Sequence, residues 1–360
     1  MNCCTNCFSD PGLRSRIETI SKTTGKCDFC ESTGVELVSC ELLSAPFEQL
    51  FELYVNHPSA EKSLKHGRPL LLHEHLKAYW QKLFNTALLK DKDVKQLVNQ
   101  IGRGSDIFNA QLFEEPVEIA LFLDNQDQPA ENLERKWDLF SEEIKRINRF
   151  FISEMIDTET LSSVFERLVI TYPAGTCFYR ARISDKLLSN VELGKPPFEL
   201  ATPGRANPVG IPCLYVSESE ETTLYETRVA LHEGISIGKF KLTESMSVVS
   251  LRNVSSFGPF EITDRGFVIE EFVRFRPYLQ KLENELSRPV RKQDVHLDYL
   301  PTQFLCEYIK SEGFDAVEYK SGMNEQGYNL AVFNDQKLNL ESSTHYKVNN
   351  LKYEWGLCTG

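Results

Sequence analysis

The sequence lacks long hydrophobic runs and concentrated positive charge. Its 360 residues contain no stretch of about 18 apolar residues, and residues 1–4 begin neither a basic segment nor the apolar core of a secretion signal. No run of Lys or Arg exceeds two residues, and the formal net charge is −12. A membrane-spanning helix and a constitutive nucleic-acid interface are therefore not expected, and the chain is predicted to be cytoplasmic.

Glycine-rich phosphate-binding motifs are also missing. Neither G-x-G-x-x-G nor G-x-x-x-x-G-K occurs, so no helix N-terminus is marked out to hold a pyrophosphate. A phosphate-bearing ligand would then depend on arginine side chains. With 41% hydrophobic residues and a length above the usual 100 to 200 or so per domain, the chain is expected to form two or three folding units.

Cysteine is plentiful but unevenly placed, with six of the ten cysteines in the first 40 residues. Two C-x-x-C pairs, separated by 19 residues, have the spacing with which two thiolate turns converge on one tetrahedral zinc. The four predicted ligands are Cys4, Cys7, Cys27 and Cys30. A closed four-thiolate site has no open coordination position, so a structural role is expected. Cys3 and Cys40 are spare, and either replaces a ligand or simply packs.

Helical periodicity dominates residues 43–168. Arg68 and Pro69 open one segment in which apolar residues recur every three or four positions. Its members are Leu72, Leu76, Tyr79, Trp80, Leu83 and Leu88. A second stripe comprises Phe140, Ile144, Ile147 and Phe151. The pattern predicts an all-α helical bundle that follows the zinc knuckle.

The pattern changes again after residue 170, where short strand-like runs alternate with two helices. The runs cover residues 177–179, 214–216, 248–251, 316–319 and 330–333. One helix is expected to begin near Ser217 or Ser219 and to end at Gly234, and the other to span about Thr302 to Lys310. Strands mixed with few helices indicate an α+β fold.

Several polar residues stand in this second half in a characteristic order. They lie in residues 179–182, 204–215, 223–227 and 318–321, followed by residues 329–333. Their order and spacing resemble the RES family, over residues 170–333. The resemblance implies an ADP-ribosyltransferase-like fold that destroys NAD, and it implies Arg205, Tyr215, Glu226 and Ser321 as catalytic residues.

Glu226 and Arg205 suit two different parts of that chemistry. Cleavage of the nicotinamide–ribose bond builds positive charge on the ribose, which an ionised carboxylate stabilises. Glu226 stands eleven residues after Tyr215, among Leu224, Tyr225 and Ala230, so partial desolvation is expected. Arg205, in a Gly-Arg-Ala-Asn-Pro turn, is expected to offer its guanidinium to the pyrophosphate without competing helix contacts.

Tyr179, Arg180 and Asn329 are predicted to bind NAD alongside these residues. Tyr215 and Tyr179 offer a flat ring and a hydroxyl, although core packing is a rival role. Arg180 would bind the pyrophosphate, unless it pairs with a surface acid. Ser321 would donate to the ribose, the carboxamide or Glu226. Asn329 completes the motif or caps a turn.

Arg68 and His73 match the R-x4-H spacing of HEPN ribonucleases, and HEPN-like helical domains precede some RES domains. Any helix-rich chain with several Arg and His yields this spacing by chance, so a helix-start Arg and a surface His are favoured over a catalytic pair. Three functions therefore remain: an NAD-consuming toxin or antiviral-defence effector, a HEPN-type ribonuclease, and a non-catalytic zinc-bearing interaction protein. The acidic composition disfavours the ribonuclease.

The expected organisation is a zinc knuckle over residues 1–42, a HEPN-like helical domain over 43–168 and a RES catalytic domain over 169–360. Structural zinc and NAD as substrate are the ligands expected. Partners would be an antitoxin or regulatory protein and further copies of the chain, with the front half holding the catalytic site shut. Water, phosphate and a protein side chain all remain open as acceptors of the ADP-ribose, so the enzyme would be a glycohydrolase, a phosphorylase or an ADP-ribosyltransferase.

Overall fold

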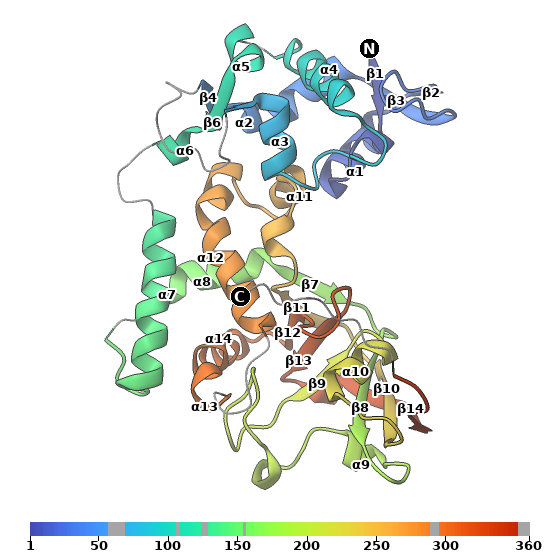
Figure 1. Cartoon of the computed structure of the whole chain (residues 1–360), viewed down its shortest axis with the longest axis vertical. Coiled ribbons are helices and arrows are strands. Elements are labelled where there is room, and N and C mark those ends of the chain that lie inside the picture. Colours follow the sequence, from blue (N-terminus) through green and yellow to red (C-terminus); the bar gives the residue numbers. More distant parts are fainter. Residues whose placement is uncertain (57–68, 106–108, 124–128, 154–155, 289–294, 352–360) are drawn as a thin grey trace. The chain divides into compact units, whose positions relative to one another are not determined.

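The computed structural model describes residues 1–56, 69–105, 109–123, 129–153, 156–288 and 295–351. The chain divides into two compact units, one of residues 1–133 with 255–278 and the other of residues 134–254 with 279–360 (Figure 1). Both units contain segments from distant parts of the sequence. The three-part division expected from the sequence remains a prediction.

The first unit combines short helices with two three-stranded antiparallel sheets. The first sheet has the order β1-β3-β2, and the second the order β4-β6-β5. The strands are β1 (Asn2–Cys4), β2 (Thr23–Gly25), β3 (Val35–Ser39), β4 (Tyr54–Asn56), β5 (Leu70–Leu71) and β6 (Pro116–Ile119). The helices are α1 (Pro11–Ile20), α2 (Ser44–Phe51), α3 (Leu72–Tyr79), α4 (Asp91–Gly102), α5 (Ala110–Glu114), α6 (Ala120–Leu123) and α11 (Pro259–Asp264). Because β4, β5 and β6 lie within residues 43–168, the expected all-α bundle is not confirmed.

The two predicted apolar stripes are only partly correct. Residues Leu70 and Leu71 pair with β6, so the first helix starts at Leu72 rather than at Pro69. This helix ends at Tyr79, and Leu88 is exposed. The second stripe is buried at Phe140 and Ile144, but α7 (Pro129–Arg146) ends before Ile147 and Phe151, which are 73% and 87% exposed. Residues that follow the end of a helix no longer lie on its buried face, even when they continue the helical spacing in the sequence.

The second unit is built on an eight-stranded sheet of order β14-β10-β8-β9-β13-β12-β11-β7, in which β11 and β12 are parallel and the other neighbours antiparallel. The strands are β7 (Val169–Tyr172), β8 (Cys177–Ile183), β9 (Leu214–Ser217), β10 (Gly234–Leu242), β11 (Met246–Ser250), β12 (Ala316–Lys320), β13 (Tyr328–Val332) and β14 (Leu338–Lys347). The helices of this unit are α8 (Thr158–Arg167), α9 (Asn190–Leu193), α10 (Glu220–Thr227), α13 (Val295–Asp298) and α14 (Leu300–Ser311). Parts of α7 and of α12 (Ile269–Ser287) also belong to it. All five predicted strands and the mixed α+β class are confirmed.

Short 3-10 turns link some of these elements in both units. They are Thr5–Cys7, Cys40–Leu43, Phe198–Leu200, Val254–Ser256 and Asp335–Lys337.

Alternation along β8 separates two apolar clusters of the second unit. Phe178 belongs to the larger cluster, with Leu214 and Val216 of β9, whereas Ala181 and Tyr179 pack on the other side with Ile237. Successive side chains of a strand point to opposite faces, so both faces of the sheet are covered. The central strands of the sheet are thereby packed on both sides.

The two helices predicted after residue 170 agree with the structure to different degrees. Ser219 caps α10 by accepting a hydrogen bond from the Thr222 amide, as the sequence indicates. However, α10 ends at Thr227, because Arg228 has left-handed backbone geometry with φ of 50°, and Gly234 already begins β10. The helix expected over residues 302–310 is confirmed as α14. The sequence analysis missed α12, whose internal Pro277 removes a backbone donor.

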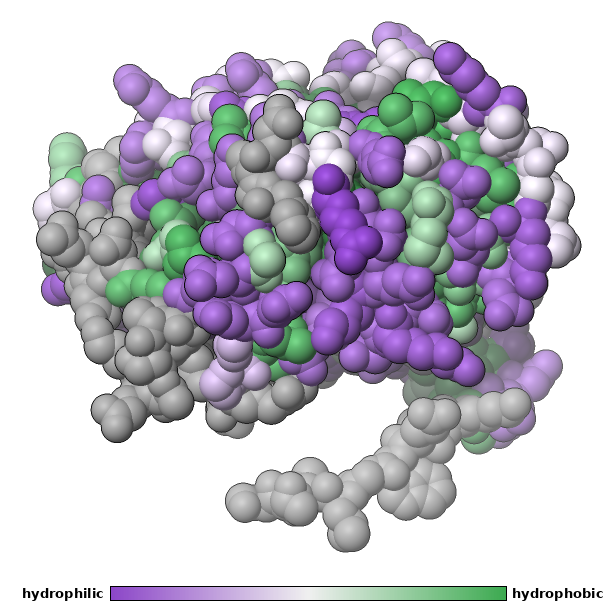
Figure 2. Space-filling view, turned by 90° about the horizontal axis from the view of Figure 1, so that it is seen from above, coloured by the Kyte–Doolittle hydropathy of each residue, from purple (hydrophilic) through white to green (hydrophobic). Residues whose placement is uncertain are grey.

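The surface is described by the hydropathy of its residues. On the face seen in Figure 2, hydrophilic residues predominate and hydrophobic residues occur in scattered areas. Within the residues that the structure describes, no helix combines the length and the apolar character needed to cross a membrane.

Candidate functional site

A cavity of about 300 Å³ lies in the second unit where β8 and β9 separate. Among the described residues, β8 and β9 pair only at Tyr179 and Ser217, whereas β8 pairs with β10 over seven residues. Side chains from β8, β9, β12, β13 and α10 line the space that this opening leaves. The lining residues are Tyr179, Arg180, Ala181, Arg205, Tyr215, Val216, Ser217, Thr223, Glu226, Thr227, Tyr299, Tyr319 and Asn329. Six of the seven predicted catalytic and NAD-binding residues therefore lie at one cavity.

Glu226 reaches this cavity from the last turn of α10 and is held by two hydrogen bonds. Its Oε1 accepts from Ser321 Oγ at 2.6 Å and from Asn329 Nδ2 at 2.7 Å. Within the described part of the chain, Oε2 accepts none. Glu226 as a whole residue is exposed, whereas its two hydrogen bonds at Oε1 are partly buried, so only part of the side chain is in contact with solvent. The carboxylate is thus fixed in orientation while one oxygen remains available.

Ser321 and Asn329 are themselves fixed by further contacts. The buried Ser321 Oγ accepts hydrogen bonds from the backbone amides of Met323 and Asn324, at 3.1 and 3.0 Å, so its proton is directed to Glu226. The Oδ1 atom of Asn329 accepts from Ser217 Oγ at 2.6 Å, which directs its amide group to the same carboxylate. Asn329 lies within β13 and does not cap a turn. Ser321 stands behind Glu226 and does not line the cavity.

Tyr215 holds the turn that carries Arg205. Its hydroxyl donates to Asn207 Oδ1 at 2.7 Å and accepts from the Ala206 amide at 2.9 Å. Gln303 of α14 donates to the Asn207 carbonyl at 2.9 Å and anchors the same turn. Burial raises the pKa of Tyr215, so the phenol stays neutral. The hydroxyl of Tyr215 is therefore already engaged by protein groups.

The Arg205 guanidinium lies between two aromatic rings. Its Cζ is 5.8 Å from the ring centroid of Tyr299 and 5.7 Å from that of Tyr319, within the range of cation–π attraction. Its Nη1 donates to the Leu286 carbonyl at the end of α12, contrary to the expectation that no helix competes for it. That carbonyl is free because the last four carbonyls of a helix lack partners within it. One donor is used there, and guanidinium carries five.

Arg180 also lines this cavity. Its Nη1 donates to the Tyr215 carbonyl at 3.0 Å, and its buried Nε has no partner among the described residues. Burial, and secondarily the neighbouring charge of Arg182, lower the pKa of Arg180 to about 10, so it is positively charged at neutral pH. The alternative of an Arg paired with a surface acid is not supported. Tyr179 lines the same cavity and also packs against the apolar cluster that contains Ala181 and Ile237.

Two aromatic residues of the cavity were missed by the sequence analysis. Tyr319 stands within the predicted strand of residues 316–319, two positions before Ser321, and this nearness to a predicted site residue could have marked it. Burial raises the pKa of Tyr319, so its side chain is uncharged beside Arg205. Tyr299 immediately precedes α14 and carries no local signal.

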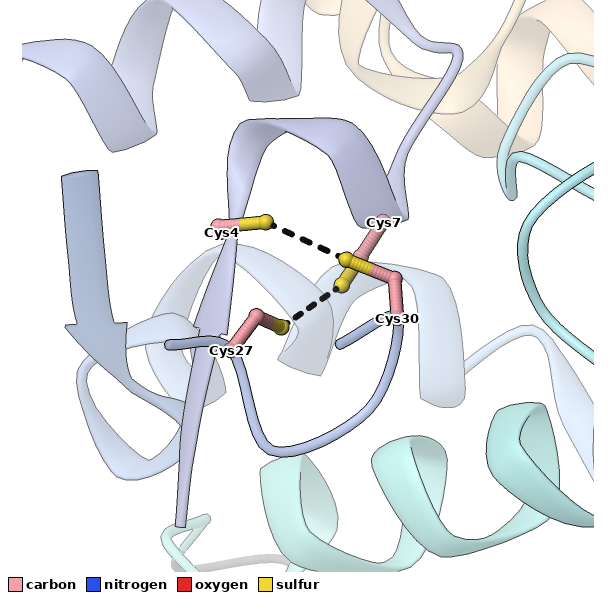
Figure 3. A group of neighbouring side chains, drawn as sticks. All are labelled: Cys4, Cys7, Cys27 and Cys30. Carbon is pink, nitrogen blue, oxygen red and sulfur yellow. Dashed lines mark hydrogen bonds between the residues drawn. The ribbon is translucent and has the colours of Figure 1, made fainter. Parts of the chain in front are cut away.

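A separate cysteine cluster lies in the first unit (Figure 3). The Sγ atoms of Cys4 and Cys30 are 3.5 Å apart, those of Cys7 and Cys27 are 3.4 Å apart, and all four lie within 4.8 Å of one another. Tetrahedral zinc with Zn–S bonds of about 2.3 Å separates its sulfurs by about 3.8 Å. The four side chains point toward a common centre from two short turns, so the donor set fits zinc.

The other sequence candidates of the first unit do not join a site. The group of cysteines that could hold a metal includes neither Cys3 nor Cys40, and both are buried. Arg68 lies outside the described residues. His73 is only 5% exposed, with its Nε2 3.2 Å from Asp91 Oδ2, so the expectation of a surface His is wrong. The helix α3 turns His73 inward, toward the first residue of α4.

The mixed sheet, its flanking helices and its cavity define the second unit as an α+β domain with a cleft lined by charged, polar and aromatic side chains. Residues 178–355 match the family model of the RES domain, and this part of the chain is therefore a RES domain. A chain of the M. tuberculosis MbcT–MbcA toxin–antitoxin complex is structurally similar, with 16% identity and a TM-score of 0.32, over 52% of this chain and 91% of that chain. No match was found among curated proteins.

Proposed function

We propose that this protein is an NAD-consuming enzyme that cleaves the nicotinamide–ribose bond. The observation that carries the proposal is the Glu226 carboxylate, held by Ser321 and Asn329 at a cavity that two arginines also reach. The RES domain supports the same substrate, since RES toxins process NAD.

Glu226 would stabilise the positive charge that develops on the ribose as the bond breaks. Hydrogen bonds from Ser321 and Asn329 occupy Oε1 and orient the group, while Oε2 has no partner in the described structure. A carboxylate already oriented in this way needs no reorganisation during the reaction, which is the main source of electrostatic catalysis. The exposure of Glu226 leaves room for substrate to cover it.

Arg205 and Arg180 would bind the pyrophosphate. The Arg205 guanidinium lies near Tyr299 and Tyr319 and donates one side-chain hydrogen bond among the described residues, and Arg180 has a buried Nε with no protein partner among them. Tyr215 would be a positioning residue, because its hydroxyl holds the Arg205 turn. Tyr179 would provide a ring face for the nicotinamide.

The biological role that follows is that of a toxin whose activity is restrained by an antitoxin or by the front half of the chain. A cut near residue 169 cannot test this restraint, because α7 and α8 belong to the same compact unit as the cavity. The full chain should instead be assayed with and without chelator. A change in NAD turnover on removal of zinc would support regulation by the first unit.

The deciding experiment is incubation of the full chain with NAD, and separately with RNA, followed by mass spectrometry of the products. Release of nicotinamide supports the proposal, and the second product identifies water, phosphate or a protein side chain as the acceptor. Intact NAD with degraded RNA would overturn it in favour of the ribonuclease. No contact of His73 favours that alternative, since the side chain is buried against Asp91.

The zinc would be structural. Cys4, Cys7, Cys27 and Cys30 would provide four thiolates, and their cluster joins β1 to the loop between β2 and β3. Such a closed site contributes to folding rather than to catalysis.

A further inference from the structure

A chain of hydrogen bonds links the three segments that meet at Glu226. Glu226 lies on α10, Asn329 lies on β13, and Ser321 precedes the loop of residues 322–327. The distances between the carboxylate and its two donors therefore depend on how α10 is held against the loop and the strand. Because the donors are about a hundred residues away in the sequence, a tertiary contact has to set this arrangement.

Thr222, in the first turn of α10, makes such a contact with the loop. The residue is 0% exposed, and its Oγ1 accepts a hydrogen bond from Asn324 Nδ2 at 2.9 Å. The backbone amide of Asn324 in turn donates to Ser321 Oγ at 3.0 Å. Thr222 and Glu226 are four residues apart and so lie on the same face of the helix. The loop that holds Ser321 is thus fastened to the helix that carries Glu226.

Glu218 connects the same hydroxyl to β13. Thr222 Oγ1 donates its single proton to Glu218 Oε1 at 2.7 Å, and Glu218 Oε2 accepts from the backbone amide of Tyr328 at 2.9 Å. Tyr328 directly precedes Asn329, the second donor to Glu226. The Thr222 hydroxyl therefore has one partner on the loop and another that leads to the strand.

The loop also packs directly on Thr222. A Cβ atom at Gly327 would lie 2.4 Å from Thr222 Oγ1 and 2.9 Å from Thr222 Cγ2, so a larger residue does not fit there. The carbonyl of Gly327 accepts a hydrogen bond from the Ser321 amide at 2.9 Å. Both ends of the loop are therefore held close to the first turn of α10.

We propose that Thr222 is a positioning residue, which holds α10 against the loop and β13 so that Ser321 and Asn329 both donate to Glu226. This inference rests on the proposed function, because it gives Thr222 a part in the same reaction. Thr222 does not line the cavity, so it acts through Glu226 rather than on NAD.

The test removes the hydroxyl of Thr222 while keeping the shape of the side chain. Thr222→Val in the full chain should lower kcat for nicotinamide release about tenfold and leave the KM for NAD within about twofold. Thr222→Ser keeps the hydroxyl and should retain kcat within about twofold. The matched control is Thr243→Val, because Thr243 donates one hydrogen bond to the Lys337 carbonyl and does not line the cavity. This control should change neither value.

A double substitution distinguishes positioning from a general loss of structure. Once Glu226→Gln has removed the carboxylate charge, the addition of Thr222→Val should lower kcat no further. A tenfold loss in both backgrounds would overturn the inference, and so would a Thr222→Ser protein as impaired as Thr222→Val. Asn324→Ala breaks the same contact from the loop and should also lower kcat about tenfold. A folded Asn324→Ala protein with the parent kcat would overturn the inference, whether or not Thr222→Val folds.

Hydrogen exchange separates this inference from the proposed function. The amides of Met323 and Asn324 donate to Ser321 Oγ, so their exchange rates report on the loop without any turnover. Thr222→Val should raise these rates about tenfold, and Thr243→Val should not. Unchanged exchange in Thr222→Val would overturn the inference even if nicotinamide is released. Faster exchange in a protein whose parent leaves NAD intact would mean that the proposed reaction fails and the positioning contact stands.

Discussion

The substitution Glu226→Gln isolates the charge of the carboxylate from its shape. Glutamine has the same length, and its Oε1 can still accept the hydrogen bonds that Ser321 and Asn329 now donate at 2.6 and 2.7 Å. The side chain is exposed, so the change introduces no buried unpaired group. Stability should therefore remain near that of the unmodified protein, and NAD should still bind.

The expected loss lies in turnover. A unit charge about 4 Å from a developing positive charge contributes about 4 kcal/mol at an effective dielectric of about 20, and exposure of Glu226 reduces this figure. Removal of one electrostatic stabiliser of a transition state costs about 2.7 to 4 kcal/mol, or roughly 100- to 1,000-fold in kcat. The lower end is expected here because of the solvent exposure.

The assay follows nicotinamide release by chromatography at saturating NAD, with NAD binding measured separately by calorimetry. The matched control is Glu221→Gln, because Glu221 is an exposed glutamate of the same helix that does not line the cavity. This control should retain full activity. Nicotinamide release by Glu226→Gln at the parent rate would refute the assignment, and Glu220 would then be examined next.

Three further changes test the rest of the site and the metal. Arg205→Ala should weaken NAD binding by about 2 to 3 kcal/mol with little effect on kcat, because the contact exists before and during cleavage; a loss confined to kcat would contradict the role. Ser321→Ala should lower kcat about tenfold by freeing Glu226 from one of its two hydrogen bonds, and an unchanged kcat would count against it. Purified protein should contain one zinc per chain, and Cys27→Ser should lose the metal and lower the melting temperature, whereas metal content well below one per chain would exclude the site.

Features determined by neighbouring residues could be predicted from the sequence. The C-x-x-C pairs define two turns, and the structure brings their sulfurs within 4.8 Å of one another. Ser219 caps its helix through an amide three residues away, and α14 follows its local pattern closely. The helix cap and α14 depend on contacts between residues a few positions apart in the chain. The cysteine cluster depends on a spacing that is typical of tetrahedral zinc sites.

The candidate site was predictable as a set of residues but not as an arrangement. The order of Arg205, Tyr215, Glu226 and Ser321 identified the RES family. The sequence did not decide which group Ser321 contacts, because the hydrogen bond to Glu226 spans 95 residues and depends on where α10 meets the loop after β12.

Only the tertiary structure decided what surrounds those residues. The opening between β8 and β9 creates the cavity, the end of α12 provides a carbonyl to Arg205, and Tyr299 reaches its guanidinium from a distant turn. The same holds for the limits of the apolar stripes, since Phe151 continues a helical spacing after α7 has ended. Residue spacing determines which face a side chain occupies within an element. Strand separation, helix ends and contacts between distant segments arise from packing of the whole unit, and no local pattern encodes them.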